Sequence, residues 1–141
     1  MHKNSRALRI EWGDCDPAGI VFYPRYFAMF DQSTHLLIET ACGLSKYEML
    51  QAYDFTGYPM VDTRGRFMIP CRFGDDVTVH STFARIGRSS FEVEHKLFKK
   101  GDLCLEGFET RVWVGRDPQD ASKIKSKPIP DDLVTKFRAG P

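Results

Sequence analysis

The segment from residue 25 to residue 42 is the feature that most constrains the fold. It contains no proline or glycine, and it lies between Pro24, which suits the first turn of a helix, and Gly43, which suits a helix C-cap. The most polar positions form a single stripe, spaced by seven: Arg25, Gln32 and Glu39. A helix with so narrow a polar stripe is buried over most of its circumference. We therefore expect a sheet to wrap around this helix, with help from a second subunit.

Strand-like alternation occupies most of the remaining sequence. Residues 6–12 set Leu8, Ile10 and Trp12 against charged neighbours, which is typical of a half-buried strand. A short amphipathic segment follows the helix at residues 46–53. Turns that contain glycine then separate four more predicted strands, at residues 61–73, 77–86, 91–98 and 103–114.

Hairpin-linked strands after a single long helix predict an α+β fold, with an antiparallel sheet curled around that helix. Residues 116–130 contain three prolines and are predicted to be a loop, whereas Asp131 and Asp132 favour the start of a short terminal helix. No internal repeat and no linker divides the sequence. One domain over residues 1–141 is therefore expected.

The composition excludes several classes of function. The formal net charge is +1 and the signs are mixed along the chain, so no basic tract predicts binding to nucleic acid or a membrane surface. No stretch approaches the ~20 apolar residues of a membrane span, and the polar residues 1–6 do not resemble a signal peptide. The four cysteines show no Cys-x-x-Cys pair and no zinc-like spacing, which predicts reduced thiols in a cytoplasmic protein and no metal site.

The most informative motif is WGDCDPAGIVFYPRYF, residues 12–27, between the first strand and the helix. Turn formation alone explains its Asp14 and Asp16, because aspartate suits turns, and on the residues alone this is the favoured interpretation. A carboxylate held beside a helix N-terminus could instead be a reactive group, because the helix end supplies N–H groups and partial positive charge for a developing oxyanion. Cys15 is a weaker candidate nucleophile, because no histidine near it in sequence could activate its thiol.

This motif and the order of the elements resemble the 4-hydroxybenzoyl-CoA thioesterase branch of the hot-dog-fold acyl-CoA thioesterases. The most specific match is GDCDPAGIV, residues 13–21, which Tyr23-Pro24-x-Tyr26 continues, and the resemblance covers roughly residues 6–115. It implies a long helix wrapped by an antiparallel sheet, a homodimer or homotetramer, and an active site at the subunit interface. It also implies an acyl-CoA substrate with a hydroxybenzoyl-like acyl group, and it implies no metal or redox cofactor.

Carried over residue by residue, the resemblance makes Asp16 the catalytic carboxylate and the backbone N–H of Tyr23 the donor that polarises the thioester carbonyl. Asp14 is then expected to brace the loop. The turn that spans residues 85–90 falls where this branch binds coenzyme A phosphates, which assigns four residues to substrate binding: Arg85, Arg88, Ser89 and Ser90. An exposed turn arginine without a ligand explains Arg88 equally well.

Asp31 and His35 lie one turn apart in the predicted helix, on a face shared with Phe27 and Ile38. Asp31 could bind a polar group at the acyl end of the substrate, such as an aryl hydroxyl. A mutually satisfied buried pair is at least as good an explanation, because buried charges need partners.

The favoured function is hydrolysis of an aromatic acyl-CoA to the free acid and coenzyme A, with Asp16 as nucleophile or general base. A broad short-chain acyl-CoA or acyl-carrier-protein thioesterase is the alternative in the same class. Hot-dog hydratases and dehydratases rely on a histidine paired with an acid, and His35 is expected to be the only histidine near the helix core, so this function is less favoured. A non-catalytic acyl-CoA-binding module would bind the thioester without releasing a thiol.

Overall fold

The computed structural model describes residues 1–140 of the chain. Within them one strand, one long helix and four further strands follow one another as expected, and a small hairpin and a terminal helix complete the chain. The elements in order are β1 (Lys3–Arg9), the 3-10 helix η1 (Trp12–Asp14), α1 (Tyr23–Cys42), α2 (Lys46–Ala52), β2 (Met60–Phe67), β3 (Asp76–Ile86), β4 (Ser90–Lys99), β5 (Asp102–Val112), β6 (Val114–Asp117), β7 (Asp120–Ser126) and α3 (Asp131–Arg138).

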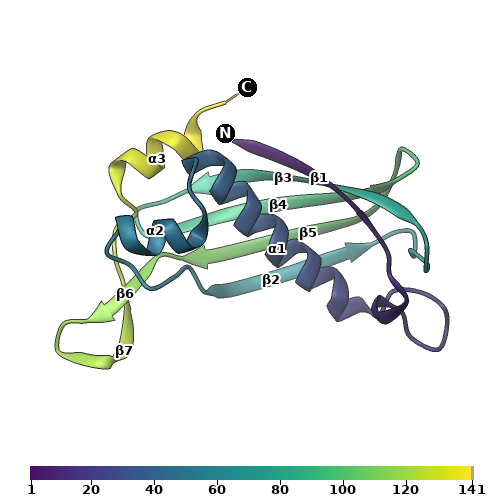
Figure 1. Cartoon of the computed structure of the whole chain (residues 1–141), viewed down its shortest axis with the longest axis horizontal. Coiled ribbons are helices and arrows are strands. Elements are labelled where there is room, and N and C mark those ends of the chain that lie inside the picture. Colours follow the sequence, from purple (N-terminus) through teal and green to yellow (C-terminus); the bar gives the residue numbers. More distant parts are fainter. Residues whose placement is uncertain (141) are drawn as a thin grey trace.

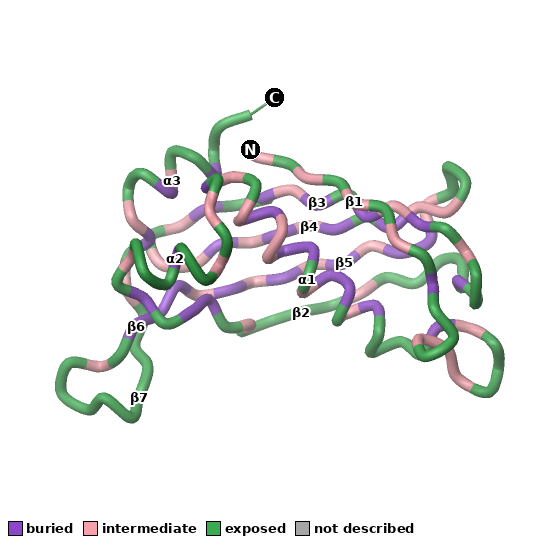
Figure 2. Tube along the Cα trace, viewed as in Figure 1, coloured by how far each residue is buried: buried purple, intermediate pink, exposed green. Residues whose placement is uncertain are grey.

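Five strands form one antiparallel sheet in the order β1-β3-β4-β5-β2, and α1 crosses one face of it diagonally (Figure 1). The predicted α+β fold is therefore confirmed. Within the described residues β2 pairs only with β5, so its outer edge presents unpaired backbone N–H and C=O groups. Most of β2 is exposed (Figure 2).

The signals in the sequence set the limits of α1. Pro24 occupies its first turn, and Gly43 ends it in the left-handed conformation, with φ of 73°. The residues that α1 buries against the sheet and the other helices are Tyr26, Met29, Phe30, Ser33, Thr34, Leu37, Ile38 and Cys42. The expectation of burial nearly all round is not met within one chain, because Ala28 is exposed and Phe27 and Leu36 are only partly buried.

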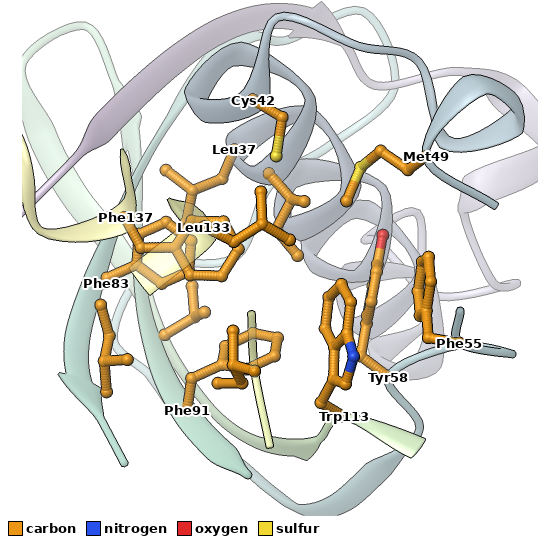
Figure 3. Close-up of a cluster of buried hydrophobic side chains, with 14 residues drawn as sticks. Leu37, Cys42, Met49, Phe55, Tyr58, Phe83, Phe91, Trp113, Leu133 and Phe137 are labelled. Atoms are coloured by element: carbon orange, nitrogen blue, oxygen red, sulfur yellow. The ribbon is translucent and has the colours of Figure 1, made fainter. Parts of the chain in front are cut away.

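Two apolar clusters fill the space around α1. One lies where α2 and α3 cover the C-terminal half of α1, and it includes Phe55, Tyr58 and Trp113 (Figure 3). The rings of Trp113 and Phe55 stack at 4.1 Å between their centroids. The other lies under the N-terminal half of α1 and includes Ile10, Val21 and Tyr26. Because Ile10 and Val21 flank the loop between β1 and α1, this second cluster holds both ends of the loop that carries the motif.

Three predicted strand and loop limits were wrong, each for a local reason. Trp12 is 74% exposed, because the chain leaves β1 after Arg9 and turns into η1. The strand predicted over residues 61–73 ends at Phe67, because the N–H groups of Met68 and Ile69 both donate to a single carbonyl, that of Cys104. Residues 116–130 are not a plain loop, since β7 folds back and pairs with β6.

Candidate active site

The two aspartates of the motif both stabilise the loop between β1 and α1, each through different hydrogen bonds. Asp14 accepts a hydrogen bond from the backbone N–H of Glu11 through Oδ2 at 2.8 Å, and the Glu11 side chain returns the contact in a capping box. The carbonyl of Asp14 also accepts from the N–H of Phe22 at 2.8 Å. Asp14 therefore joins the start of the loop to its end, which is the bracing role expected of it.

Asp16 heads a tight turn in the same loop. Its Oδ1 accepts from the N–H of Ala18 at 2.8 Å, and its carbonyl accepts from the N–H of Gly19 at 2.9 Å. Gly19 has φ of 81°, a conformation that glycine adopts without a steric penalty. No donor in residues 1–140 binds Oδ2 of Asp16, and the partly exposed carboxylate lines a surface depression of about 370 Å³ together with Phe22 and Arg25. Asp16 thus serves the turn with one oxygen and leaves the other accessible.

Tyr23 begins α1 and leaves a backbone donor free. The N–H of Arg25 donates to the carbonyl of Phe22 at 2.8 Å, and Pro24 has no N–H to offer. No acceptor in the described chain binds the N–H of Tyr23, and no side chain caps this helix end. The helix dipole adds partial positive charge at the same place, so an oxyanion is favoured there. Tyr23 also lines a largely apolar pocket of about 180 Å³, with Tyr26, Phe67, Met68, Ile69 and Leu105 among its other walls.

Asp31 and His35 form the predicted pair, but Asp31 has a stronger partner. Arg111 donates from Nη2 to Oδ1 of Asp31 at 2.7 Å, while Nε2 of His35 lies 3.3 Å from Oδ2. Burial acts to raise the pKa of Asp31, but the hydrogen bond and charge of Arg111 outweigh it and the pKa lies below its ordinary value. The Asp31 side chain is 49% exposed. The pair is therefore partnered but not buried, and Asp31 remains accessible to a ligand.

His35 is held in one tautomer by its neighbours. Burial and the charge of Lys46 lower its pKa, so the ring is neutral at pH 7. Since the Asp31 carboxylate only accepts, we assign the ring proton to Nε2, and Nδ1 then accepts from the hydroxyl of Tyr58 at 2.6 Å. Burial raises the pKa of Tyr58, which keeps its proton available for this bond.

The sequence analysis missed a buried polar cluster beneath α1. His95 stacks on Phe30 at 4.8 Å between ring centroids, so the expectation that His35 is the only histidine near the helix core is wrong. Glu109 accepts from Nε of Arg111 at 2.8 Å and from the hydroxyl of Thr34 at 2.7 Å. A signal was present, because strand alternation puts Glu109 and Arg111 on the same face as the buried Leu105.

The predicted phosphate-binding residues in the turn between β3 and β4 differ in how far their side chains are already hydrogen-bonded. Arg85 donates from Nε to Glu92 at 2.9 Å and from Nη2 to the Ser90 hydroxyl at 3.3 Å. Ser89 and Arg88 each accept a backbone hydrogen bond through their carbonyls, from Trp113 and Ile129 respectively. The exposed Arg88 guanidinium has no hydrogen-bond partner in residues 1–140, which leaves it available to an anion.

One chain does not bring the two halves of the predicted site together. The loop with Asp16 lies at the Asp76 end of β3, where the N–H of Ile10 donates to the carbonyl of Asp75 at 2.8 Å. The turn with Arg88 follows the other end of β3, and the 11 residues of this strand span about 33 Å when extended. Figure 1 shows these two regions at opposite ends of the sheet.

Residues 1–140 contain no group of three or more histidine, cysteine or acidic side chains that could hold a metal ion. All four cysteines are free, and the only side-chain hydrogen bond from Cys15 goes to the carbonyl of Glu11 at 3.7 Å. No helix among residues 1–140 combines the length and hydropathy needed to cross a membrane.

Comparisons with known proteins agree with this architecture. The family model described as the thioesterase superfamily matches residues 18–106. The 4-hydroxybenzoyl-CoA thioesterase of Pseudomonas sp. strain CBS-3 is 28% identical over 132 residues, which are 89% of this chain and 91% of the relative.

Two solved structures are similar over almost the whole chain. One is an aspartate-to-asparagine mutant of 4-hydroxybenzoyl-CoA thioesterase complexed with 4-hydroxybenzoyl-CoA, with a TM-score of 0.85, 26% identity, and coverage of 97% of this chain and 99% of that one. The other is a gentisyl-coenzyme A thioesterase, with a TM-score of 0.81, 29% identity, and coverage of 95% and 99%. The expected hot-dog fold is thereby confirmed. The chain belongs to the thioesterase superfamily, a family of thioester hydrolases.

Proposed function

We propose that this protein hydrolyses aromatic acyl-CoA thioesters to the free acid and coenzyme A. One observation carries the proposal: a short segment of the chain has a reactive group at each end. Asp16 at one end has a carboxylate oxygen with no hydrogen-bond donor, and Tyr23 at the other has a helix N-terminal N–H with no acceptor. Relatives that act on 4-hydroxybenzoyl-CoA and gentisyl-CoA support the acyl class.

In this proposal the Tyr23 N–H and the dipole of α1 bind the oxygen of the thioester carbonyl as negative charge develops on it. Asp16 either attacks the carbonyl carbon, which forms an anhydride that water then cleaves, or removes a proton from an attacking water. In both routes the C–S bond breaks and coenzyme A leaves as a thiolate, which takes up a proton. The mutant relative that holds its thioester after an aspartate-to-asparagine change supports an essential carboxylate.

Two further regions would bind the rest of the substrate. The apolar pocket beside Tyr23, walled by Phe67 and Met68, suits an aromatic ring, and Asp31 would accept a hydrogen bond from a ring hydroxyl. At the other end, the free guanidinium of Arg88 would bind a coenzyme A phosphate, with Arg85, Ser89 and Ser90 forming the surrounding turn.

A complete site would require two copies of the chain. An unpaired, exposed edge strand such as β2 is suited to pairing with the same strand of a second copy. Antiparallel pairing about a two-fold axis reverses the second copy, so the Arg88 end of one chain comes beside the Asp16 loop of the other. We therefore propose a homodimer, alone or within a homotetramer, with each active site at the subunit interface. We also propose a single domain over residues 1–141 and, from the four free cysteines, a cytoplasmic location.

Thiol release from a panel of acyl-CoA thioesters tests the proposed function. The panel contains 4-hydroxybenzoyl-CoA, benzoyl-CoA, short-chain acyl-CoAs and an acyl-carrier-protein thioester. Highest kcat/KM on an aryl-CoA supports the proposal. Equal or higher values on short chains would favour the broad thioesterase, and tight binding without thiol release would favour an acyl-CoA-binding module.

A further inference from the structure

A continuous series of polar side chains runs under α1 and ends at Asp31. The Ser81 hydroxyl lies 2.7 Å from Nδ1 of His95, and Nε2 of His95 lies 3.1 Å from Oε2 of Glu109. Glu109 accepts from Nε of Arg111 at 2.8 Å, and Arg111 donates from Nη2 to Asp31 at 2.7 Å. No buried polar side-chain atom in residues 1–140 lacks a hydrogen-bond partner. The series is thus fully satisfied, although the hydrolysis described above uses none of its buried members.

The charged side chains of this series are buried except for the last one, Asp31. The side chains of Glu109 and Arg111 are 2% and 4% exposed, whereas that of Asp31 is 49% exposed. A buried ion pair adds little net stability compared with apolar residues of similar size. The guanidinium of Arg111 instead uses two of its N–H groups to join the buried carboxylate of Glu109 to the accessible carboxylate of Asp31. The main effect of this geometry is therefore on Asp31, whose position and negative charge it fixes, and not on the stability of the core.

We propose that Arg111 is a positioning residue, which holds Asp31 as an anionic acceptor and thereby selects acyl groups that carry a hydroxyl donor. The inference rests on the proposed function and extends it to the choice of substrate. Arg111 binds one oxygen of Asp31 and His35 lies beside the other, so each oxygen keeps a lone pair for a ligand. A ring hydroxyl can donate to that lone pair, a ring hydrogen cannot, and an anionic substituent is repelled.

Arg6 provides a matched control for a purely structural role. Like Arg111, it projects from a strand and binds α1, with Nε donating to the Ser33 hydroxyl and Nη2 to the carbonyl of Met29, both at 2.9 Å. No hydrogen bond or ion pair joins Arg6 to Asp31 within residues 1–140. Loss of Arg6 therefore tests how much a missing arginine bridge between sheet and helix matters by itself.

The experiment measures the ratio of kcat/KM for 4-hydroxybenzoyl-CoA to that for benzoyl-CoA. Arg111→Lys keeps one charged donor, and the double variant Glu109→Gln with Arg111→Met removes both buried charges, so that neither is left unpaired. We expect the wild-type ratio to exceed ten and to fall by about tenfold in the double variant, the contribution of one charge-assisted hydrogen bond, with most of the loss on the hydroxylated substrate. Arg111→Lys should retain part of the ratio, and Arg6→Met should keep all of it.

A pH profile adds a readout that a structural role would not move. The charged and titratable groups that face Asp31 are Arg111 from β5, His35 from α1, Lys46 from α2 and Tyr58. Glu109 binds the other side of Arg111. The profile is measured on Arg111→Lys, which keeps part of the ratio. One ammonium group binds Glu109 and Asp31 less well than the guanidinium does, so the carboxylate of Asp31 loses part of the interaction that favours its ionised form, and selectivity should disappear at a higher pH on acidification than in the wild type.

The outcomes separate this inference from the function on which it rests. Wild-type protein that hydrolyses neither aryl-CoA would end the proposed function and the inference together. Wild-type protein that hydrolyses both thioesters equally would end only the inference. The same holds if folded Arg111 variants keep the wild-type ratio, or if Arg6→Met loses it to the same extent.

Discussion

The ring of Phe30 lies so close to the backbone of Gly107 that a β-carbon at position 107 would stand 2.4 Å from the ring. Phe30 is on α1 and Gly107 is on β5, so this contact sets how near the helix approaches the sheet. No side chain larger than hydrogen fits there unless α1 or the ring moves.

Gly107→Ala should therefore destabilise the protein. Overpacking of this kind lowers the free energy of unfolding by about 1–3 kcal/mol. The backbone of β5 carries the new β-carbon and cannot rotate away from the ring as a side chain could. Urea unfolding followed by circular dichroism measures the change. Gly13→Ala is the matched control, because a β-carbon there meets no atom within 4 Å. Equal urea midpoints of unfolding for the two variants would show that the close approach of Phe30 to Gly107 does not limit the side chain at position 107.

His35 should make stability depend on pH near neutrality. Its pKa is lowered in the folded protein by burial and by Lys46, so the unfolded chain binds protons that the folded chain does not. The free energy of unfolding should therefore fall as the pH drops below about 6.5, the ordinary pKa of histidine. His35→Gln should flatten this slope between pH 7 and pH 5. His80→Gln, at an exposed site bonded to Ser5, should keep it, and an unchanged slope in His35→Gln would contradict the assignment.

The features that the sequence predicted well depend on neighbours in the chain. Pro24 and Gly43 act within one turn of α1, and Asp14 braces a loop through Glu11, three residues away. Trp12 was misplaced for a similarly local reason, because the Glu11–Asp14 capping box turns the chain just where alternation would have continued.

The features that the sequence could not supply depend on distant partners. The buried cluster joins Thr34 to Glu109, 75 positions apart, and alternation shows only that Glu109 points inward, not what it meets. The separation of Asp16 from Arg88 likewise follows from the direction of β3, so spacing in the sequence does not reveal that one chain carries half of each proposed site.

Arg88→Ala should raise KM and leave kcat nearly unchanged. A phosphate far from the reacting carbonyl is held equally in the ground and transition states, so its loss affects binding alone. The effect should shrink as salt is added, since the attraction at an exposed arginine is screened. Lys96→Ala, an exposed cation on β4, is the control for general surface charge. An unaltered KM for Arg88→Ala at low ionic strength would make this residue an ordinary turn arginine.

Mixing two defective chains tests whether sites form between subunits. In a dimer of an Asp16→Asn chain with an Arg88→Ala chain, one interface site would have both residues intact and the other neither. Random exchange should then restore about a quarter of the wild-type kcat/KM, since half the dimers are mixed and each has one good site. Light scattering should report at least a dimer. A stable, active monomer, or no recovery on mixing, would contradict the shared site.

The role of Asp16 is the central claim, and single-turnover hydrolysis of 4-hydroxybenzoyl-CoA by Asp16→Asn tests it most directly. Asparagine keeps an acceptor for the N–H of Ala18 but removes the negative charge. The rate should fall by ~10²–10⁴-fold, the usual cost of losing a positioned base, while a non-hydrolysable analogue still binds. Asp14→Asn, the matched control, should mainly lower the melting temperature. Asp16→Asn protein that binds the analogue and hydrolyses the thioester within a few-fold of the wild-type rate would show that Asp16 only forms the turn.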